Sequence, residues 1–245
     1  MIRKTPALLA IAAIFVSTLS FAEEFVSDDD LFADDFEQTT RPVADPFKGA
    51  NKAIFKFNDY VYLKLLKPVS KGYEKVMPNI AEKGIHNFFE NLKYPRRLVS
   101  NVLQLKFKQA GKETGKFLID TTVGLGGTIA VSKGIPSLET TNEDLGQALG
   151  KWGVGHGFYI VVPFLGPTTL RDGFGRIGES YLNPTSRRWD LVTEWEERLA
   201  LTSLDVINES PQLIEFYESF LSASIAPYEG IKDGYIQGRE KQVAE

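Results

Sequence analysis

The chain of 245 residues carries 28 basic and 32 acidic side chains, so its formal net charge is −4. This length is ample for one sizeable hydrophobic core, and the slightly acidic balance argues against nucleic acid as a partner. The sequence contains no cysteine, so no disulfide supports the fold, which must rest on its core.

The first 22 residues have the pattern of a secretory signal peptide. Arg3 and Lys4 precede an apolar run from Ala7 to Phe21, and the small-x-small sequence Ser20-Phe21-Ala22 stands before Glu23. This pattern predicts export, with cleavage after Ala22 and loss of residues 1–22. A retained membrane anchor is the alternative, but the run is short for a helix that spans a bilayer.

Charge is unevenly distributed along the mature chain. Residues 23–37 hold eight acidic residues and no basic ones, so we predict an acidic, disordered leader over residues 23–44. Residues 48–116 hold 15 basic and 5 acidic residues, a balance of +10. This basic part suits anionic lipid headgroups or an acidic partner, and a solvated lysine-rich helix surface is the plainer alternative.

The first half of the body predicts short helices separated by prolines. Asp45-Pro46 predicts an N-cap and a first turn, and apolar residues then recur every three or four positions until Lys67-Pro68 ends the helix. These apolar residues are Phe47, Ala50, Ile54, Phe57, Val61 and Leu65. Further helices are predicted to begin at Met77-Pro78 and Tyr94-Pro95, and to run from Lys108 to Thr122.

Two glycine-rich segments follow. Residues 123–134 are small, apolar and almost uncharged, so they form either a buried turn-rich connection or a flexible amphipathic hairpin in contact with lipid. The segment lacks the Gly-Lys-Ser/Thr ending of a phosphate-binding loop. Residues 149–157 carry a glycine at every second or third position and run into an aromatic and β-branched stretch, which favours close backbone approach and burial away from water.

The last third returns to helical spacing. One helix is predicted around Trp189 to Leu204, a second begins at the N-cap pair Ser210-Pro211, and residues 226–239 close the fold. Residues 240–245 are predicted to fray. No internal repeat or linker interrupts residues 45–239, so we predict one compact all-α domain of short stacked helices.

Residues suited to catalysis are few. No Gly-x-Ser-x-Gly elbow occurs, and the only histidines are His86 and His156. His86 lies one helical turn from Glu90, but no third metal ligand is evident, and a surface histidine beside a carboxylate is the simpler interpretation. Arg171 and Asp172 are adjacent, so a helix would point them apart, and we expect them to tie neighbouring segments together through buried hydrogen bonds. No metal site, cofactor or enzymatic activity is therefore predicted.

Several short motifs together resemble the VacJ/MlaA family of outer-membrane proteins that maintain lipid asymmetry in Gram-negative bacteria. Any one motif is weak, but their order along the chain, roughly from Asp45 to Arg239, makes the set specific. The matching pieces are Asp45-Pro46-Phe47 with Asn51, Phe55-Lys56-Phe57-Asn58, Lys67-Pro68, Asn87-Phe88, Asn91-Leu92, Asn101, Leu103-Gln104, Phe117 to Gly124, Gly126-Gly127, Glu143 to Gln147, Leu149 to Pro167, Pro227-Tyr228 and Tyr235-Ile236-Gln237.

The resemblance implies a ring-like helical body around a central amphipathic channel, at the periplasmic face of the outer membrane. Members of the family associate with trimeric porins, take phospholipids misplaced in the outer leaflet and pass them to a soluble periplasmic carrier, without making or breaking a bond. By this resemblance, the residues expected to bind lipid or to line or gate the channel are Phe55, Phe57, Asn58, Leu125, Gly126, Gly127, Ile129, Val131, Gly153, Gly155 and Phe158.

The sequence departs from the family pattern in one respect, because family signal peptides end in an acylated lipobox cysteine. With no cysteine present, side chains are expected to hold this protein at the membrane. Two other functions stay open. One is a soluble periplasmic lipid-binding or scaffold protein, which membrane fractionation would distinguish. The other is a periplasmic hydrolase that uses His156, which a lipid-turnover assay would distinguish.

Cleavage after Ala22 predicts a mature chain that begins at Glu23 and carries no acyl group. N-terminal sequencing and intact-mass measurement of the protein purified from cells check this prediction. A terminus at Met1 would show instead that the apolar run is retained as an anchor.

Overall fold

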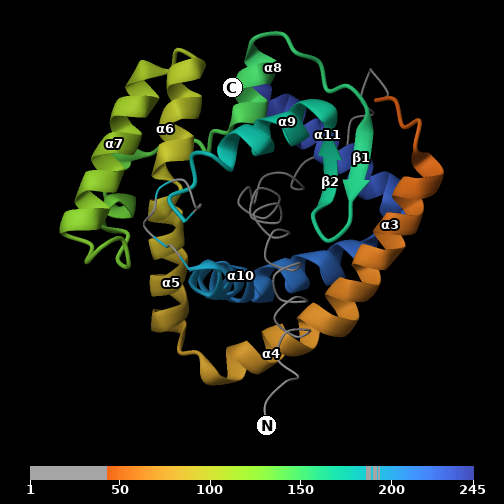
Figure 1. The fold of residues 1–245 in the computed structure, drawn as a ribbon, viewed down its shortest axis with the longest axis horizontal. Coiled ribbons are helices and arrows are strands. Elements are labelled where there is room, and N and C mark those ends of the chain that lie inside the picture. The colour runs from red at the N-terminus through yellow and green to blue at the C-terminus, as the bar shows by residue number, and fades with distance from the viewer. Residues whose placement is uncertain (1–42, 186–188, 190–191, 193) are drawn as a thin grey trace. The chain divides into compact units, whose positions relative to one another are not determined.

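The computed structural model describes residues 43–185, 189, 192 and 194–245. The predicted signal peptide and residues 23–42 of the predicted leader lie outside this part of the chain. The described residues form helices and one short β-hairpin (Figure 1), which confirms the predicted all-α class. None of the helices in this part has the length and apolar character needed to cross a bilayer.

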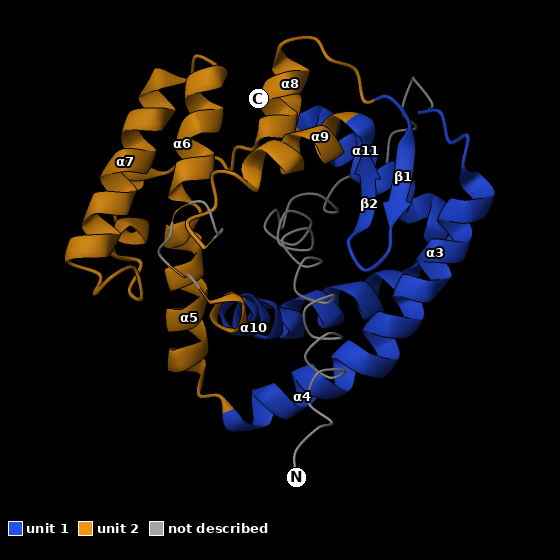
Figure 2. Ribbon diagram, in the orientation of Figure 1, with its two compact units in different colours: residues 1–76, 157–170, 199–241 blue, residues 77–156, 171–198, 242–245 orange. Residues whose placement is uncertain are grey.

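The chain divides into two compact units (Figure 2), each built from stretches that are far apart in the sequence. Unit 1 contains residues 1–76, 157–170 and 199–241, and unit 2 contains residues 77–156, 171–198 and 242–245. The ring-like arrangement around a channel and the single domain over residues 45–239 stay predictions.

Unit 1 combines consecutive N-terminal helices, a β-hairpin and most of two long C-terminal helices. The elements are α3 (Lys48–Val61), the π-helix η1 (Tyr62–Leu66), α4 (Lys67–Val76), β1 (Tyr159–Val162), β2 (Gly166–Thr169), α10 (Trp195–Ala223) and α11 (Pro227–Ala244). β1 and β2 pair antiparallel, with Tyr159 opposite Thr169 and Val162 opposite Gly166. Because α11 extends to Ala244, the predicted fraying of residues 240–245 is wrong for all but the last residue.

Two clusters of buried side chains form the core of unit 1. The larger cluster joins α3 and η1 to α10 and α11, and the smaller one packs the hairpin against α11. The larger contains Val61, Tyr62, Leu66, Val206, Leu213, Ile214, Tyr217 and Ile231, and the smaller contains Tyr159, Val161, Tyr228, Tyr235 and Ile236. Burial of these aromatic and branched side chains supplies the main driving force for folding this unit.

The first helix does not end at Lys67-Pro68, where the sequence predicts a break. α3, η1 and α4 follow one another without a gap, and the π-helical turn lies directly before Pro68. In this turn the Lys67 N–H donates to the Tyr62 carbonyl, five residues earlier. The wider turn gives room for the proline ring, which in a regular α-helix clashes with the carbonyl four residues before it. Burial of Leu66 and Ser70 on either side holds the helix together.

The second predicted break, at Ser210-Pro211, is also absent, because α10 runs through Pro211. Proline has no N–H to donate to the Ile207 carbonyl, and the Ser210 hydroxyl donates to that carbonyl instead, at 2.7 Å. Leu213 and Ile214, two and three residues after the proline, are buried in the core. A side-chain hydrogen bond and core packing together override the local helix-breaking signal.

The predicted apolar face of the first helix coincides only in part with its buried face, because Val61 is buried and Ile54 packs against the core. Phe47, Phe57 and Leu65 are 53%, 43% and 44% exposed, whereas Asn51 and Asn58 are 1% and 3% exposed. The helical period was therefore identified correctly, but the side that faces the interior of unit 1 carries two asparagines. Polar groups buried in this way need hydrogen-bond partners.

Asp45 also has a different role from the predicted N-cap. α3 begins at Lys48 and has no side-chain cap at its N-terminus. The Asp45 carboxylate instead accepts hydrogen bonds from Asn51 Nδ2 at 2.8 Å and from the Tyr228 hydroxyl at 2.6 Å. Asp45 thus links the start of α3 to α11, within unit 1.

Asn51 binds the outer edge of β1 with its carboxamide. Its Nδ2 donates to the Tyr159 carbonyl at 3.1 Å, and its Oδ1 accepts from the Val161 N–H at 2.9 Å. β1 pairs with β2 along its other edge. The asparagine therefore bonds backbone groups that a third strand would otherwise bond.

Asn58, two helical turns later, binds the end of β1 and the turn after it. Its Nδ2 donates to the Val162 carbonyl at 3.0 Å, and its Oδ1 accepts from the Phe164 N–H at 2.6 Å. The Tyr62 hydroxyl donates to the Phe164 carbonyl at 2.7 Å. Seven helical residues rise about 10.5 Å, and three strand residues span about 10 Å, so the spacing of the two asparagines matches that of the strand.

Unit 2 is built from short helices, and α6 and α7 pack against each other (Figure 1). Its elements are α5 (Asn79–Leu92), α6 (Tyr94–Leu103), α7 (Phe107–Thr122), η2 (Val131–Gly134), η3 (Pro136–Leu138), α8 (Leu145–Lys151) and nearly all of α9 (Leu170–Glu179). The predicted helix starts at Met77-Pro78 and Tyr94-Pro95 are confirmed, because Pro78 directly precedes α5 and Pro95 lies in the first turn of α6.

A buried ion pair joins α6 to α7 inside unit 2. Arg97 Nε donates to Glu113 Oε2 at 2.8 Å, and Glu113 is fully buried. Thr140 and Lys116 also donate to the Glu113 carboxylate. Burial by itself raises the pKa of Glu113, but Arg97, Thr140 and Lys116 outweigh burial and lower it, so the carboxylate stays ionised. The ion pair and the stacked rings of Tyr94 and Phe117, with centroids 4.3 Å apart, together join α6 to α7.

Asn58→Ala is expected to lower the free energy of unfolding by about 1–3 kcal/mol, because the Val162 carbonyl and the Phe164 N–H lose their side-chain partner. Urea unfolding followed by circular dichroism measures the loss. Lys56→Ala, which changes an exposed residue of the same helix, is the control. Its free energy of unfolding should stay within about 0.5 kcal/mol of the parent value. Equal stability of the two variants would mean that the carboxamide contributes nothing to holding β1.

Candidate functional site

Four phenylalanines of unit 1 form two pairs along α3 and the hairpin. The Phe47 and Phe158 rings meet edge to face with centroids 6.3 Å apart, and the Phe57 and Phe164 rings do so at 5.0 Å. Phe47, Phe57 and Phe158 are more than two-fifths exposed, and Phe164 is half-buried. We call these four residues the aromatic face. Two predicted channel residues, Phe57 and Phe158, belong to it.

Lysines lie along α3, η1 and α4. Lys48 and Lys52 bind Glu229 of α11 at 2.9 and 3.1 Å. Burial alone raises the pKa of Glu229, but the two lysines outweigh it, and the pKa is lowered. The exposed lysines further along are Lys56, Lys64, Lys71 and Lys75. A lysine can cover apolar surface with its stem while its ammonium group reaches a charged headgroup.

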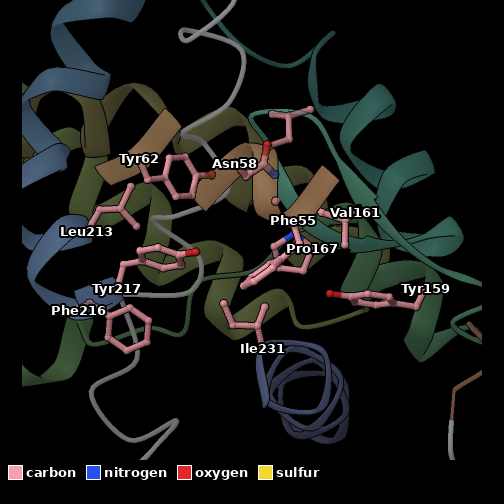
Figure 3. A pocket seen from close by; sticks show the side chains of 12 residues that line it. Phe55, Asn58, Tyr62, Tyr159, Val161, Pro167, Leu213, Phe216, Tyr217 and Ile231 are labelled. Carbon is pink, nitrogen blue, oxygen red and sulfur yellow. The ribbon is translucent and has the colours of Figure 1, made fainter. Parts of the chain in front are cut away.

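Unit 1 also contains a pocket of about 600 Å³, which includes its mouth to solvent (Figure 3). Its wall is almost wholly apolar and comes from α3, η1, the hairpin, α10 and α11. Phe55 and Asn58 of the predicted channel residues line it, together with Tyr159, Leu213, Phe216 and Ile231. An apolar lining of this kind is typical of small-molecule sites.

The first glycine-rich segment forms a compact hydrogen-bonded turn after α7, here called the glycine turn (residues 123–131). The N–H groups of Gly126 and Gly127 donate to the carbonyls of Thr121 and Asp120, at 2.9 and 2.8 Å. The Asp120 carboxylate accepts from the Ser132 N–H at 2.8 Å and from its hydroxyl at 2.6 Å. Both ends of the turn are therefore fixed to the end of α7.

Gly127 cannot be replaced by a larger residue without rearrangement. Its φ is +94°, and a Cβ would lie 2.6 Å from the Asn91 side chain on α5. Asn91 Nδ2 donates to Thr121 Oγ1 at 2.8 Å, and Asn87 Nδ2 donates to the Thr128 carbonyl at 3.2 Å. The glycine lets the turn sit directly on α5.

The glycine turn exposes apolar side chains at its tip. Val123, Leu125 and Ile129 are 64%, 72% and 52% exposed, and Val131 is half-buried. Leu125 also has a φ of +54°, which is rare and strained for a bulky residue. The predicted buried connection is therefore wrong for these side chains. These exposed apolar side chains stand on a firmly bonded backbone and are available for a contact outside the turn.

The second predicted glycine segment lies after α8. Gly153 has a φ of +86°, so the backbone itself requires glycine there. Gly155 has no positive φ, and a Cβ at this position would have no atom within 4 Å. Trp152, next to this segment, is 59% exposed and donates from Nε1 to the Leu103 carbonyl at 2.9 Å.

The sequence predicts that the Arg171 and Asp172 side chains point apart, but they bond each other. Arg171 Nε donates to Asp172 Oδ1 at 2.8 Å, and both side chains are buried. The Arg171 N–H donates to the His156 carbonyl at 3.3 Å, which links the start of α9 to the glycine segment. Within the described residues, no group of three or more His, Cys, Asp or Glu side chains is placed to hold a metal ion.

The predicted channel residues fall into three groups. Phe55, Phe57, Asn58 and Phe158 lie in unit 1, whereas Leu125, Gly126, Gly127, Ile129 and Val131 form the glycine turn of unit 2. Gly153 and Gly155, also in unit 2, follow α8 and lie near the end of α6, whereas the glycine turn binds α5 and α7. The pocket is not among the features predicted from the sequence, and its one local signal is a tyrosine, Tyr159, at the start of an apolar strand.

Comparison with known proteins gives a consistent result. The MlaA lipoprotein family matches residues 43–242. An uncharacterized protein of Rickettsia bellii (strain RML369-C) is 29% identical over 240 residues, which are 96% of this chain and 92% of the relative. The intermembrane phospholipid transport system lipoprotein MlaA of Escherichia coli (strain K12) is 30% identical over 197 residues, 79% of this chain and 76% of the relative.

A solved structure, described as "Structural basis for maintenance of bacterial outer membrane lipid asymmetry", matches with a TM-score of 0.69 and 28% identity. The match covers 82% of this chain and 99% of that chain. The E. coli member of this family is named as a component of a lipid-transport system and not as an enzyme. This agrees with the prediction that the present protein catalyses no reaction. Sequence and fold lead to the same conclusion: the chain belongs to the MlaA lipoprotein family.

Proposed function

We propose that this protein is a phospholipid conduit at the periplasmic face of the outer membrane. It removes phospholipids misplaced in the outer leaflet and passes them to a soluble periplasmic carrier, which maintains the lipid asymmetry of the membrane. The E. coli relative is named as part of an intermembrane phospholipid transport system, and the similar solved structure concerns outer-membrane lipid asymmetry. Membership of the same family supports this role.

The structural observation that carries the proposal is the exposure of apolar side chains on firmly bonded supports. The aromatic face of unit 1 stands on a helix whose asparagines are bonded to β1. The glycine turn of unit 2 shows Val123, Leu125 and Ile129 to the outside while Asp120 fixes its backbone. Apolar surface gathered in this way marks a contact with lipid or with another protein.

Each group of predicted channel residues receives a role in this proposal. In unit 1, Phe57 and Phe158 contact acyl chains, and in unit 2 Leu125 and Ile129 have the same role. Lysines of α3 and α4 bind the anionic headgroups. Gly126 and Gly127 shape the glycine turn, and Gly155 gives the segment after α8 the freedom to move.

Two protein partners are part of the proposal. A trimeric porin holds the protein in the outer membrane, and a soluble periplasmic carrier receives the lipid. Both come from the family resemblance. The family is described as one of lipoproteins, whereas this sequence has no cysteine, so we further propose that apolar side chains and the porin supply the membrane attachment.

Leu125→Asn is expected to impair lipid removal without loss of stability. Asparagine adopts a positive φ more readily than leucine, so the melting temperature should stay equal or rise, while the apolar tip becomes polar. The assay uses cells that carry this chain as their only MlaA protein and measures the phospholipid that an added phospholipase reaches in intact cells. The parent chain should keep this amount low, and Leu125→Asn should raise it severalfold.

Leu105→Asn is the matched control. Leu105 has a φ of +61° and is 73% exposed, against +54° and 72% for Leu125, but it lies at the opposite end of α7. The control should therefore keep the accessible phospholipid low. Equal effects of the two variants would show that general surface polarity matters and the glycine turn does not. A high phospholipid level with the parent chain, folded and present in the membrane fraction, would contradict the proposed function itself.

Gly155→Ala is expected to leave the free energy of unfolding within about 0.5 kcal/mol of the parent, because the added Cβ meets no atom and the backbone needs no positive φ. If residue 155 is a hinge, the same change should raise the accessible phospholipid in cells. Gly153→Ala, in contrast, should cost about 1–2 kcal/mol, because of its φ of +86°. Gly72→Ala is the control, because a Cβ at this position in the middle of α4 also meets no atom within 4 Å. It should leave the accessible phospholipid low. Normal asymmetry with Gly155→Ala would refute the hinge.

A further inference from the structure

The pocket of unit 1 has an apolar wall (Figure 3). Most of the polar groups that line it are already hydrogen-bonded within the protein. The Asn58 carboxamide is bonded to the hairpin backbone through both its oxygen and its nitrogen. The Tyr62 hydroxyl donates to the Phe164 carbonyl at 2.7 Å, and the Tyr217 hydroxyl donates to Asp59 Oδ1 at 3.2 Å. These groups have little capacity left for a ligand.

Tyr159 is different. Its side chain is fully buried, and its hydroxyl has no hydrogen-bond partner among the described residues. In Figure 3 this hydroxyl points toward the other labelled side chains of the pocket. Burial raises the pKa of the phenol, so the hydroxyl stays protonated and can donate. An unpaired buried hydroxyl destabilises a fold, so a partner from outside the described residues accounts for its retention.

We propose that this pocket holds the part of one phospholipid acyl chain nearest the glycerol, with the Tyr159 hydroxyl donating to the ester carbonyl. The apolar wall, which includes Leu213, Phe216 and Ile231, contacts the methylene groups. The inference rests on the proposed phospholipid function and adds to it a site that lies wholly within unit 1.

Charge near Tyr159 favours an ester over a free carboxylate. Burial is the main cause of the raised pKa of Tyr159, and the negative charges of Asp45, Asp233 and Glu229 add to it. These carboxylates would repel the carboxylate of a free fatty acid, whereas an ester carbonyl is a neutral acceptor. Phospholipids and monoacylglycerols share this chemistry, an apolar chain that ends in an ester.

Photo-crosslinking can locate the chain. The mature protein is reconstituted in vesicles of phosphatidylethanolamine and phosphatidylglycerol that contain a phospholipid with a diazirine close to the ester carbonyl of one acyl chain. A second probe has the same chain joined by an ether, which lacks the carbonyl. After illumination, mass spectrometry of peptides should find the ester probe on residues 159–167 and 213–217.

Two variants test the separate parts of the site. Tyr159→Phe should lower the yield of these adducts about fivefold with the ester probe, the worth of roughly one hydrogen bond, and leave the ether probe unchanged. Without lipid, the same variant should melt at a higher temperature, because it removes an unpaired hydroxyl. Ile231→Phe fills the pocket and should abolish adducts with both probes. Ile160→Phe, on a β1 residue that does not line the pocket, is the matched control and should keep them.

Several results would overturn the proposal. One is an equal change in adduct yield with the ester and ether probes in Tyr159→Phe. This result would mean that the hydroxyl bonds water and not the ester carbonyl. Another is stronger labelling of the pocket by a diazirine fatty acid or a diazirine monoacylglycerol than by the phospholipid. Adducts confined to the glycine turn or the aromatic face would reject this pocket and leave the proposed function standing. The proposed function fails separately, if the parent chain does not restore asymmetry in cells.

Discussion

The hydrogen bonds from two asparagines of α3 to the edge of β1 are the constraint on which unit 1 depends. A two-stranded hairpin is marginally stable alone in water, and among the described residues β1 pairs with β2 and no other strand. Asn51 and Asn58 bond four backbone groups of β1 and the turn after it. With the hairpin held in this way, Tyr159 and Val161 enter the core, Phe164 meets Phe57, and the pocket acquires one of its walls.

The two units achieve order by different means. Unit 1 has large buried aromatic and branched side chains, which gain stability by leaving water. Unit 2 relies more on buried hydrogen bonds and ion pairs, such as Arg97 with Glu113 and Asp120 with Ser132. This second arrangement leaves apolar residues of unit 2, Leu125 among them, available at the surface. Both units therefore combine a fixed backbone with exposed apolar groups, as a protein that handles lipid requires.

The sequence is sufficient to predict those features that local interactions determine. Pro78 and Pro95 mark true helix starts, because proline fits the first turn of a helix in any context. The same rule fails at Pro68 and Pro211, where a π-turn and the Ser210 hydroxyl compensate for the missing N–H. The inward face of α3 could not be predicted from apolar spacing, because it is defined by a strand more than 100 residues away. The pocket has the same origin, since four separate chain segments build it.

The long sequence separations in unit 1 have a consequence for how the chain folds. Asn51 meets Tyr159 across 108 residues, and Asp59 meets Tyr217 across 158. Contacts of such high sequence separation form slowly, because a long loop must close before they contribute. During synthesis the N-terminal residues emerge first, so α3 and α4 must wait for residues 157–241 before their asparagines and apolar groups find partners. The newly made chain therefore exposes the apolar groups of α3 and α4 until its last helices arrive, and exposed apolar surface of this kind favours aggregation.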